Sequence, residues 1–266
     1  MTNFQIEAAA LSSIGNRAEN QDRLYYKIDT VDGQNCGLFC VADGMGGLAD
    51  GHLAAVAAVE GLGKWWENLP KILSSGYILE QLQNLFHDIN RQILQMANKS
   101  GTTLSVLLIV GNTYYIAHSG DSRIYMIKKS FNKAALRQLT EDHSWQAEQL
   151  KKAELTAAQI AANPLKNRIT SCLGVYENPK LFTNFGRLSR STIFILCSDG
   201  LYRAVSDKEF AKTAKRKAAS EKLAAKYLYK AALNGVSDNA SILTVTCRKR
   251  KLKGKTPGFF RFWGRG

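Results

Sequence analysis

The chain of 266 residues carries 36 Lys and Arg against 22 Asp and Glu, and 45% of its residues are hydrophobic. This is the composition of a globular protein, and the length favours one large domain, because a single core stops growing at roughly 250–300 residues. The longest apolar stretches, Thr103–Val110 and Ile193–Cys197, are far shorter than the ~20 residues that span a bilayer. No basic patch precedes an apolar run at the N-terminus, so we expect no signal peptide and a cytoplasmic protein. The five cysteines form no C-x-x-C pair, which predicts buried free thiols.

The positive charge is concentrated at the C-terminus. Eight of the net fourteen positive charges lie in residues 248–266, which contain no acidic residue and four aromatic ones. This contrast predicts a folded domain over residues 1–247 and a basic, aromatic tail over 248–266. Such a tail suits an anionic membrane surface, which would place the protein peripherally at the inner membrane, or an acidic partner protein. A solvated, disordered end is the alternative.

The predicted elements alternate between strands and helices along the chain. Alternating or short apolar runs predict strands over residues 4–11, 24–28, 37–42, 103–110, 113–118, 123–127, 193–197 and 241–246. Apolar spacings of three and four and a capping box predict helices over residues 52–66, 78–96, after 206–209 and over 220–233. The turn at Gly111–Asn112 and the loop Ser119–Ser122 predict a β-meander over 103–127. This mixed order indicates an α+β layered domain, with residues 143–168 as a flap-like excursion.

Several carboxylates stand at the ends of the predicted strands, beside glycine. Asp43 follows the strand 37–42, Asp199 follows the run 193–198, and Asp238 precedes the strand 241–246. A carboxylate at the end of a buried strand needs a cation or several hydrogen bonds. Oxygen ligands without His or Cys suit Mg²⁺ or Mn²⁺, and glycine lets a backbone carbonyl approach the metal. Asp22 and Asp121 lie in similar settings, although any one such pair with glycine is also typical of a turn.

Arg17 stands shortly before Asn20–Gln21–Asp22 in an otherwise weakly charged turn. Arginine binds phosphate through a bidentate fork, so an arginine beside a metal cluster indicates phosphoryl chemistry. An ordinary surface charge is the alternative for this residue.

Taken together, these motifs resemble the metal-dependent protein Ser/Thr phosphatases of the protein phosphatase 2C family, in their bacterial form. The matching segments, in family order, are 17–22 (RxxNQD), 41–47 (VADGMGG), 100–103 (SGTT), 120–123 (GDSR), 139–144 (LTxDHS), 169–174 (ITxxLG), 197–201 (CSDGL) and 237–239 (SDN). They cover nearly the whole domain. The resemblance implies a four-layer α-β-β-α sandwich, in which helices flank two central antiparallel sheets.

The resemblance also implies a metal centre of two core ions, Mn²⁺ or Mg²⁺. Asp43 is expected to bridge the two ions, with the Gly44 carbonyl on one of them and with Asp199 and Asp238 on the other. Asp22 is expected to hold metal-bound water from outside. The implied reaction is hydrolysis of phosphoserine or phosphothreonine by a water shared between the ions.

Two further roles follow from the resemblance. Arg17 is expected to hold the substrate phosphate, and Asp121 is expected to pair with Asp199 around a third ion found in bacterial members. The implied substrates are phosphoproteins of a cognate Ser/Thr kinase, and the kinase itself, acted on by a monomer.

Three positions depart from the family pattern. Met45 stands where many eukaryotic members have a His proposed as general acid, Gln21 replaces a common Glu, and Ser171–Cys172 stands where an Arg is frequent. His118 and His143 could act as acid–base groups, but we expect structural roles, because one lies within a strand and the other opens the excursion.

Two other readings remain open. A catalytically weak relative could bind phosphoproteins and regulate a kinase system, but the full set of metal-binding carboxylates argues against it. The basic, aromatic tail could bind nucleic acid by base stacking. The domain lacks a recognised nucleic-acid motif, so no nucleic-acid partner is expected.

Overall fold

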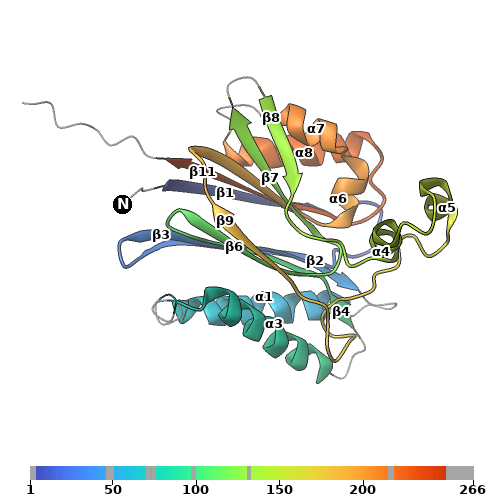
Figure 1. Cartoon of the computed structure of the whole chain (residues 1–266), viewed down its shortest axis with the longest axis horizontal. Coiled ribbons are helices and arrows are strands. Elements are labelled where there is room, and N and C mark those ends of the chain that lie inside the picture. The colour runs from blue at the N-terminus through green and yellow to red at the C-terminus, as the bar shows by residue number, and fades with distance from the viewer. Residues whose placement is uncertain are drawn as a thin grey trace, which may run out of the picture.

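Two antiparallel β-sheets stack at the centre of the molecule, and helices cover the outer face of each (Figure 1). The structure is a computed structural model that describes residues 4–45, 51–69, 73, 76–96, 100–130, 133–214 and 219–249. The layers confirm the predicted α+β fold, a four-layer α-β-β-α sandwich.

Within these residues, each sheet combines strands from distant parts of the chain. The first sheet contains, in spatial order, β1 (Phe4–Ser13), β11 (Ala240–Lys249), β10 (Ser191–Cys197), β7 (Arg123–Ser130) and β8 (Lys133–Gln138). The second contains β2 (Asp22–Val31), β3 (Gln34–Met45), β5 (Leu104–Val110), β6 (Thr113–Ser119) and β9 (Phe182–Arg187), with β4 (Gly101–Thr102) paired to β3.

Helices pack on both outer faces. The second sheet is covered by α1 (Gly51–Glu67) and α3 (Ile78–Leu94), and the first by α6 (Asp199–Ala204), α7 (Asp207–Thr213) and α8 (Ser220–Leu233). The predicted capping box of Ser206 and Glu209 begins α7. The excursion forms α4 (Trp145–Lys152) and α5 (Ala157–Ala162), which stand out from the body at one end of the sheets (Figure 1).

The core follows from the period-two alternation of the strands. In β3, Leu38 and Cys40 pack beneath α1 and α3, whereas Phe39 and Val41 point into the layer between the sheets. There they meet Phe194 of β10 and other side chains of the first sheet. β3 is buried on both faces and therefore has an almost continuous apolar sequence. All five cysteines are buried and free, as predicted.

The predicted meander over residues 103–127 is wrong. β5 and β6 form a hairpin in the second sheet, but β7 pairs with β10 and β8 in the first sheet. The connection therefore passes from one sheet to the other. Gly120 makes this passage at φ +116°, and a Cβ there would lie 2.5 Å from the Thr103 Cβ. Asp121 follows Gly120 in this crossing, between the end of β6 and the start of β7.

Other predicted boundaries also change. The sequence patterns did not predict β8, β9 or α6, and α6 begins at Asp199 itself. Arg248 and Lys249, assigned to the tail, are the last residues of β11. Residues 250–266, the rest of the basic tail, lie outside the described residues. Among the described helices, none is long and apolar enough to cross a membrane.

Candidate functional site

Asp22 and Asp43 lie directly opposite each other at one end of the second sheet. They are register partners in the antiparallel pair of β2 and β3, so both side chains leave the sheet on the same face. The backbone of Asp43 is fixed by β4 and β5: its N–H donates to Thr103 Oγ1 at 3.0 Å, and its carbonyl accepts from the Thr103 N–H at 2.9 Å. Two carboxylates are thereby held side by side on a rigid frame.

The Asp22 carboxylate is buried, at 4% exposure, and only half satisfied. Its Oδ2 accepts a hydrogen bond from Ser198 Oγ at 2.7 Å, whereas its Oδ1 has no hydrogen-bond partner among the described residues. Burial chiefly, together with the charges of Asp199 and Asp238, raises the pKa of Asp22 to about 6.

The negative charges of four neighbouring carboxylates act on Asp43. Burial raises the pKa of Asp43 well above its ordinary range, and four other carboxylates raise it further, in decreasing order Asp22, Asp199, Asp121 and Asp238. Segments separated by up to 216 positions in the sequence therefore bring their acidic side chains to a single place. Such a cluster stores electrostatic repulsion that a bound cation would relieve.

Asp238 enters the cluster on a loop that lies against the Arg17 loop. Arg17 Nη2 is 2.8 Å from Asp238 Oδ2, and both side chains are accessible, at 59% and 34% exposure. Asn239 binds the two loops together, because it accepts from the Gln21 N–H and donates to the carbonyls of Ile14 and Glu19. The phosphate-binding candidate therefore stands at the rim of the carboxylate cluster.

The loops also approach closely at a glycine beside Arg17. Gly15 adopts φ +60°, and a Cβ there would lie 2.1 Å from the Asp238 carbonyl oxygen. Only glycine fits between these backbones. The sequence thus fixes the position of Arg17 relative to Asp238 through backbone contacts as well as through the ion pair.

Asp199 and Asp121 form the other side of the cluster. Asp199 follows β10 and begins α6, where Arg203 Nη2 lies 2.9 Å from Asp199 Oδ2 and 3.9 Å from Asp121 Oδ2. Asp121 is 3% exposed, and within the part of the chain that the structure describes its Oδ1 has no hydrogen-bond partner. Burial and the charge of Asp199 raise the pKa of Asp121 to about 7, although Arg203 opposes the shift.

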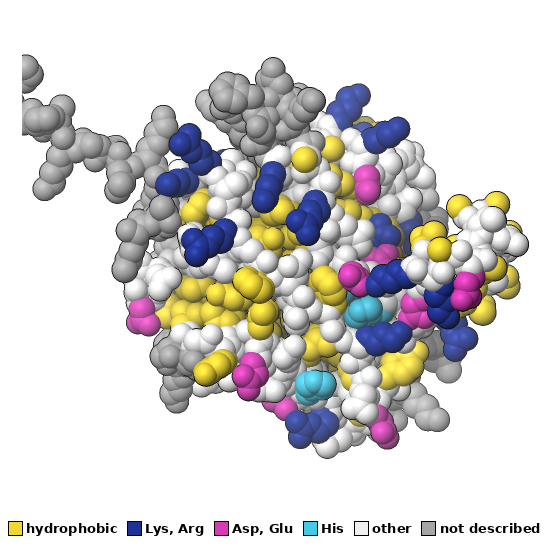
Figure 2. All heavy atoms as spheres, viewed as in Figure 1, with side chains coloured by type: hydrophobic (Ala, Val, Ile, Leu, Met, Phe, Trp, Pro, Cys, Tyr) yellow, Lys and Arg dark blue, Asp and Glu magenta, His cyan; other side chains and the backbone are white. Residues whose placement is uncertain are grey.

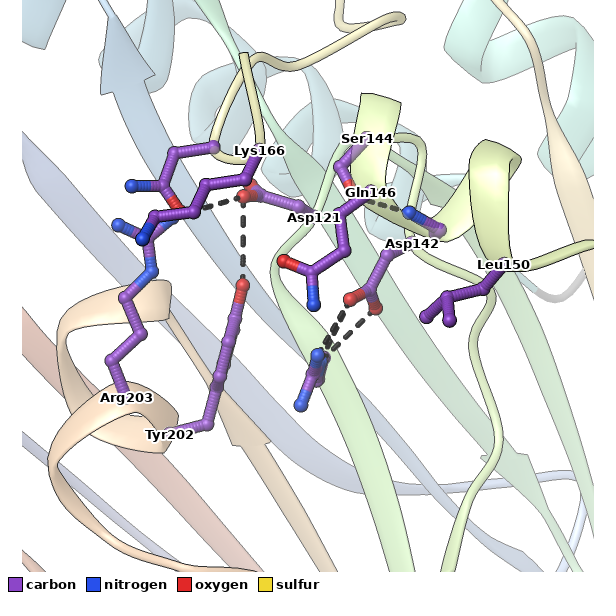
Figure 3. Close-up of a pocket in the computed structure, with 11 residues that line it drawn as sticks. Asp121, Asp142, Ser144, Gln146, Leu150, Lys166, Tyr202 and Arg203 are labelled. Carbon is purple, nitrogen blue, oxygen red and sulfur yellow. Dashed lines mark hydrogen bonds and ion pairs between the residues drawn. The ribbon is translucent and has the colours of Figure 1, made fainter. Parts of the chain in front are cut away.

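A cavity of about 290 Å³ opens beside Asp121, between α6 and the excursion. Figure 3 shows Arg203, Tyr202 and Lys166 around the Asp121 carboxylate, with Gln146 facing them from α4. Figure 2 shows acidic, basic and histidine side chains close together where α4 and α5 leave the body. The excursion therefore forms one wall of this cavity.

The residues fit divalent ions in their chemistry. The cluster offers oxygen donors only. Two of them, Asp22 Oδ1 and Asp121 Oδ1, are buried without a hydrogen-bond partner in the described ranges. As the side chains stand, no three Asp, Glu, His or Cys residues in the described ranges are arranged to hold an ion. Asp238 and Asp199 are each turned to an arginine instead.

The remaining expected positions lie around this cluster. Gly44 has no room for a side chain, since a Cβ would lie 2.3 Å from the Gly51 carbonyl oxygen. Met45 pairs with Gly101 at the end of β3, and Gln21 contributes its backbone to Gly44 and Asn239. Ser171 accepts from the Lys180 N–H, and Cys172 is buried, so this pair supports the base of the excursion.

The surroundings of His118 and His143 indicate structural roles for both residues. His118 is fully buried, with Nδ1 bonded to Ser105 Oγ at 2.7 Å and Nε2 bonded to the Glu141 carbonyl at 3.0 Å. Burial lowers the pKa of His118 to about 3 and that of His143 to about 4. Both rings are therefore neutral at physiological pH, and the two lie 5.1 Å apart.

Several residues of the site were not predicted from the sequence. Ser198 holds Asp22, Asn239 joins two loops, and Arg203 contacts two of the carboxylates. Arg123 forms a bidentate pair with Asp142 and lies 3.8 Å above the Tyr202 ring. Ser198, Asn239, Arg123 and Asp142 lie in the matched segments, but the sequence analysis gave them no role. For Arg203 the signal was the i,i+4 spacing from Asp199, which required the prediction of α6.

Comparison with known proteins points to one family. A model of the family described as protein phosphatase 2C matches residues 15–151. The serine/threonine phosphatase stp of Listeria innocua is 33% identical over 211 residues, which are 77% of this chain and 82% of that protein.

Solved structures agree. The serine/threonine phosphatase of S. agalactiae superimposes with a TM-score of 0.80 at 28% identity, and the match covers 91% of this chain and 99% of that chain. The catalytic domain of the serine/threonine phosphatase PstP, in complex with two manganese ions, has the same fold, with a TM-score of 0.77 at 24% identity. That match covers 93% of this chain and 100% of that chain.

Proposed function

Because the chain belongs to the protein phosphatase 2C family, we propose that it hydrolyses phosphoserine and phosphothreonine in proteins, with Mn²⁺ or Mg²⁺ as cofactor. The observation that carries this proposal is the carboxylate cluster of Asp22, Asp43, Asp199 and Asp238, with Arg17 at its rim. Four acidic groups in one place are costly without cations, and an arginine beside them suits a phosphate.

The proposed centre contains two core ions. Asp43 would lie between them, with the Gly44 carbonyl, Asp199 and Asp238 as further ligands and with Asp22 holding water from outside the ligand shell. When bound, the ions supply Lewis acidity, which lowers the pKa of a water molecule and neutralises charge on the phosphoryl oxygens. A relative with this fold holds two manganese ions, which supports the same class of cofactor here.

The protein itself contributes position and charge. The pairing of β2 and β3 holds Asp22 and Asp43 side by side on a rigid frame, whereas Asp199 and Asp238 would have to turn from their arginines when the ions bind. Arg17 presents an accessible guanidinium at the rim, where it can exchange Asp238 for a phosphate oxygen pair.

The proton for the leaving oxygen does not come from a histidine in this proposal. Met45 cannot donate a proton, and His118 has both ring nitrogens engaged within the fold. We propose water in the site as the donor instead.

The test is phosphate release from three matched peptides that carry phosphoserine, phosphothreonine or phosphotyrosine. We expect turnover of the first two with Mn²⁺ or Mg²⁺ and little turnover of phosphotyrosine or in excess chelator. A protein that binds the phosphothreonine peptide tightly, yet releases no phosphate with either ion, would favour the alternative of a phosphoprotein-binding regulator.

We propose further that the substrates come from a protein Ser/Thr kinase reaction, since only phosphoryl transfer to Ser or Thr supplies such esters. The kinase itself is a candidate substrate. For the basic tail we propose contact with an anionic membrane surface or an acidic partner, which the charge of residues 248–266 supports.

A further inference from the structure

Arg203 lies where the family resemblance expects a third metal ion. Its Nη2 atom is 2.9 Å from Asp199 Oδ2 and 3.9 Å from Asp121 Oδ2. One guanidinium nitrogen therefore contacts both of the carboxylates that a third ion would join. We propose that Arg203 takes the place of this ion, so that a side chain and not a divalent cation supplies the positive charge shared by Asp121 and Asp199.

The position of Arg203 is built into α6. Asp199 and Arg203 are separated by one helical turn, which brings their side chains onto the same face. The intervening Tyr202 is fixed on its other side by Arg123, which lies 3.8 Å above the ring and forms a bidentate pair with Asp142. The helix therefore holds the guanidinium in register with the two carboxylates.

The positive charges near Asp121 oppose the binding of another cation, even though Asp121 Oδ1 has no hydrogen-bond partner among the described residues. Arg203 reduces the electrostatic cost of the buried Asp121 carboxylate. Lys166, from the excursion, lies on the same side of that carboxylate in the cavity (Figure 3). A divalent ion bound there would be repelled by a guanidinium that shares both of its ligands.

This arrangement would change how the enzyme responds to metal. A third ion exchanges with solution and would make activity depend on a weak binding step, whereas a side chain is always present. The inference rests on the proposed function, because the site is defined by its position beside the two core ions. The inference predicts that the chain binds two ions and has no site for a third.

The test counts Mn²⁺ ions per chain by calorimetric titration of the full-length, metal-free protein and by anomalous diffraction. We expect two ions in the wild type and two in Asp121→Asn. Arg203→Met keeps the apolar stem but removes the charge, and we expect it to bind a third Mn²⁺ about tenfold or more weakly than the core ions. The double variant Arg203→Met/Asp121→Asn should return to two ions.

Arg91→Met is a matched control, because Arg91 also pairs within a helix, with Asp88 at 2.7 Å, but lies exposed on α3. It should bind two ions, and thermal unfolding should show that each variant is folded. Three ions in the wild type, with one lost in Asp121→Asn, would overturn the inference, and so would Arg203→Met with only two ions. A wild type that binds no Mn²⁺ would instead overturn the proposed function, and the inference with it.

Discussion

Asp22 and Asp43 face each other across the β2–β3 pair, although like charges directly opposite in a sheet are destabilising. Among the described residues, neither group forms an ion pair with a lysine or an arginine. Ser198 donates one hydrogen bond to Asp22, and Asp22 Oδ1 has no partner in that part of the chain. A fold that keeps such a pair accepts a stability cost at one site. The cost is explained if the pair receives cations when the protein is functional.

Ionisation of Asp22 and Asp121 should destabilise the metal-free protein as the pH rises from about 4 to about 7, whereas the buried, neutral His118 and His143 act in the opposite direction. The pKa of Asp22 is raised to about 6 and that of Asp121 to about 7 in the fold, whereas an unfolded Asp titrates near 3.9. At these two carboxylates the folded state therefore binds more protons than the unfolded state in this window, and their contribution to the free energy of unfolding falls as they ionise. At His118 and His143 the unfolded state binds more protons, so these two groups oppose the trend in the whole protein.

Asp121→Asn isolates one of these contributions, because the amide cannot ionise. Relative to the wild type, the variant should gain on the order of 2 kcal/mol in unfolding free energy between pH 4.5 and pH 8. Urea unfolding in chelator at both pH values measures the difference. An equal effect of the substitution at the two pH values would show that Asp121 ionises as an ordinary surface carboxylate does.

Arg17→Ala should raise KM for phosphopeptides by roughly tenfold or more, since a charge-assisted contact with phosphate is lost in the ground state and the transition state alike. Arg17→Lys should recover only part of this loss, because an ammonium cannot form the bidentate fork. Steady-state kinetics measures both. Arg187→Ala, at the far end of β9, is the control, and equal KM values for the Arg17 and Arg187 variants would count against a phosphate contact.

Gly44→Ala should weaken both stability and Mn²⁺ binding, because the added Cβ would lie 2.3 Å from the Gly51 carbonyl oxygen and 2.8 Å from that of Gln21. The strand must move, and Asp43 moves with it. Gly63→Ala in α1 is the matched control, since its Cβ comes no closer than 3.8 Å to a neighbour. It should leave Tm unchanged or raise it. If both variants bind Mn²⁺ as the wild type does, the frame around Asp43 is less rigid than the packing indicates.

Truncation should separate the function of the tail from that of the domain if the chain is cut after Lys249, where β11 ends. A chain that ends at Lys249 keeps all of β11, and it should retain hydrolysis of a small phosphate ester while losing salt-sensitive binding to anionic vesicles. Ending at Cys247 removes the pairing of Arg248 with Gln5 and of Lys249 with Phe4, which should lower Tm. Unchanged vesicle binding after truncation at Lys249 would contradict the proposed role of the tail.

The sequence was sufficient for the parts of the structure that are set locally. Apolar alternation and helical spacing located the main strands and helices, and the clustering of Asp beside Gly identified the acidic residues that come together. The turn at Gly111–Asn112 does join the β5–β6 hairpin, but the next loop was also taken for a hairpin connection. At that loop the chain crosses to the other sheet, and Gly120 makes the crossing with a positive φ. Arg203 was missed because α6 has only six residues, too few for a periodic pattern.

The most direct test of the account is a Mn²⁺ titration of the metal-free protein, with phosphate release from a phosphothreonine peptide as the readout. We predict no turnover in chelator, recovery with Mn²⁺, and loss of most activity in Asp43→Asn, which keeps the side-chain shape but removes the charge between the proposed core ions. Asp88→Asn, an exposed carboxylate on α3, should behave as the wild type does. Turnover that persists in chelator, or full activity in Asp43→Asn, would contradict the claim that this carboxylate cluster is a metal-dependent phosphatase centre.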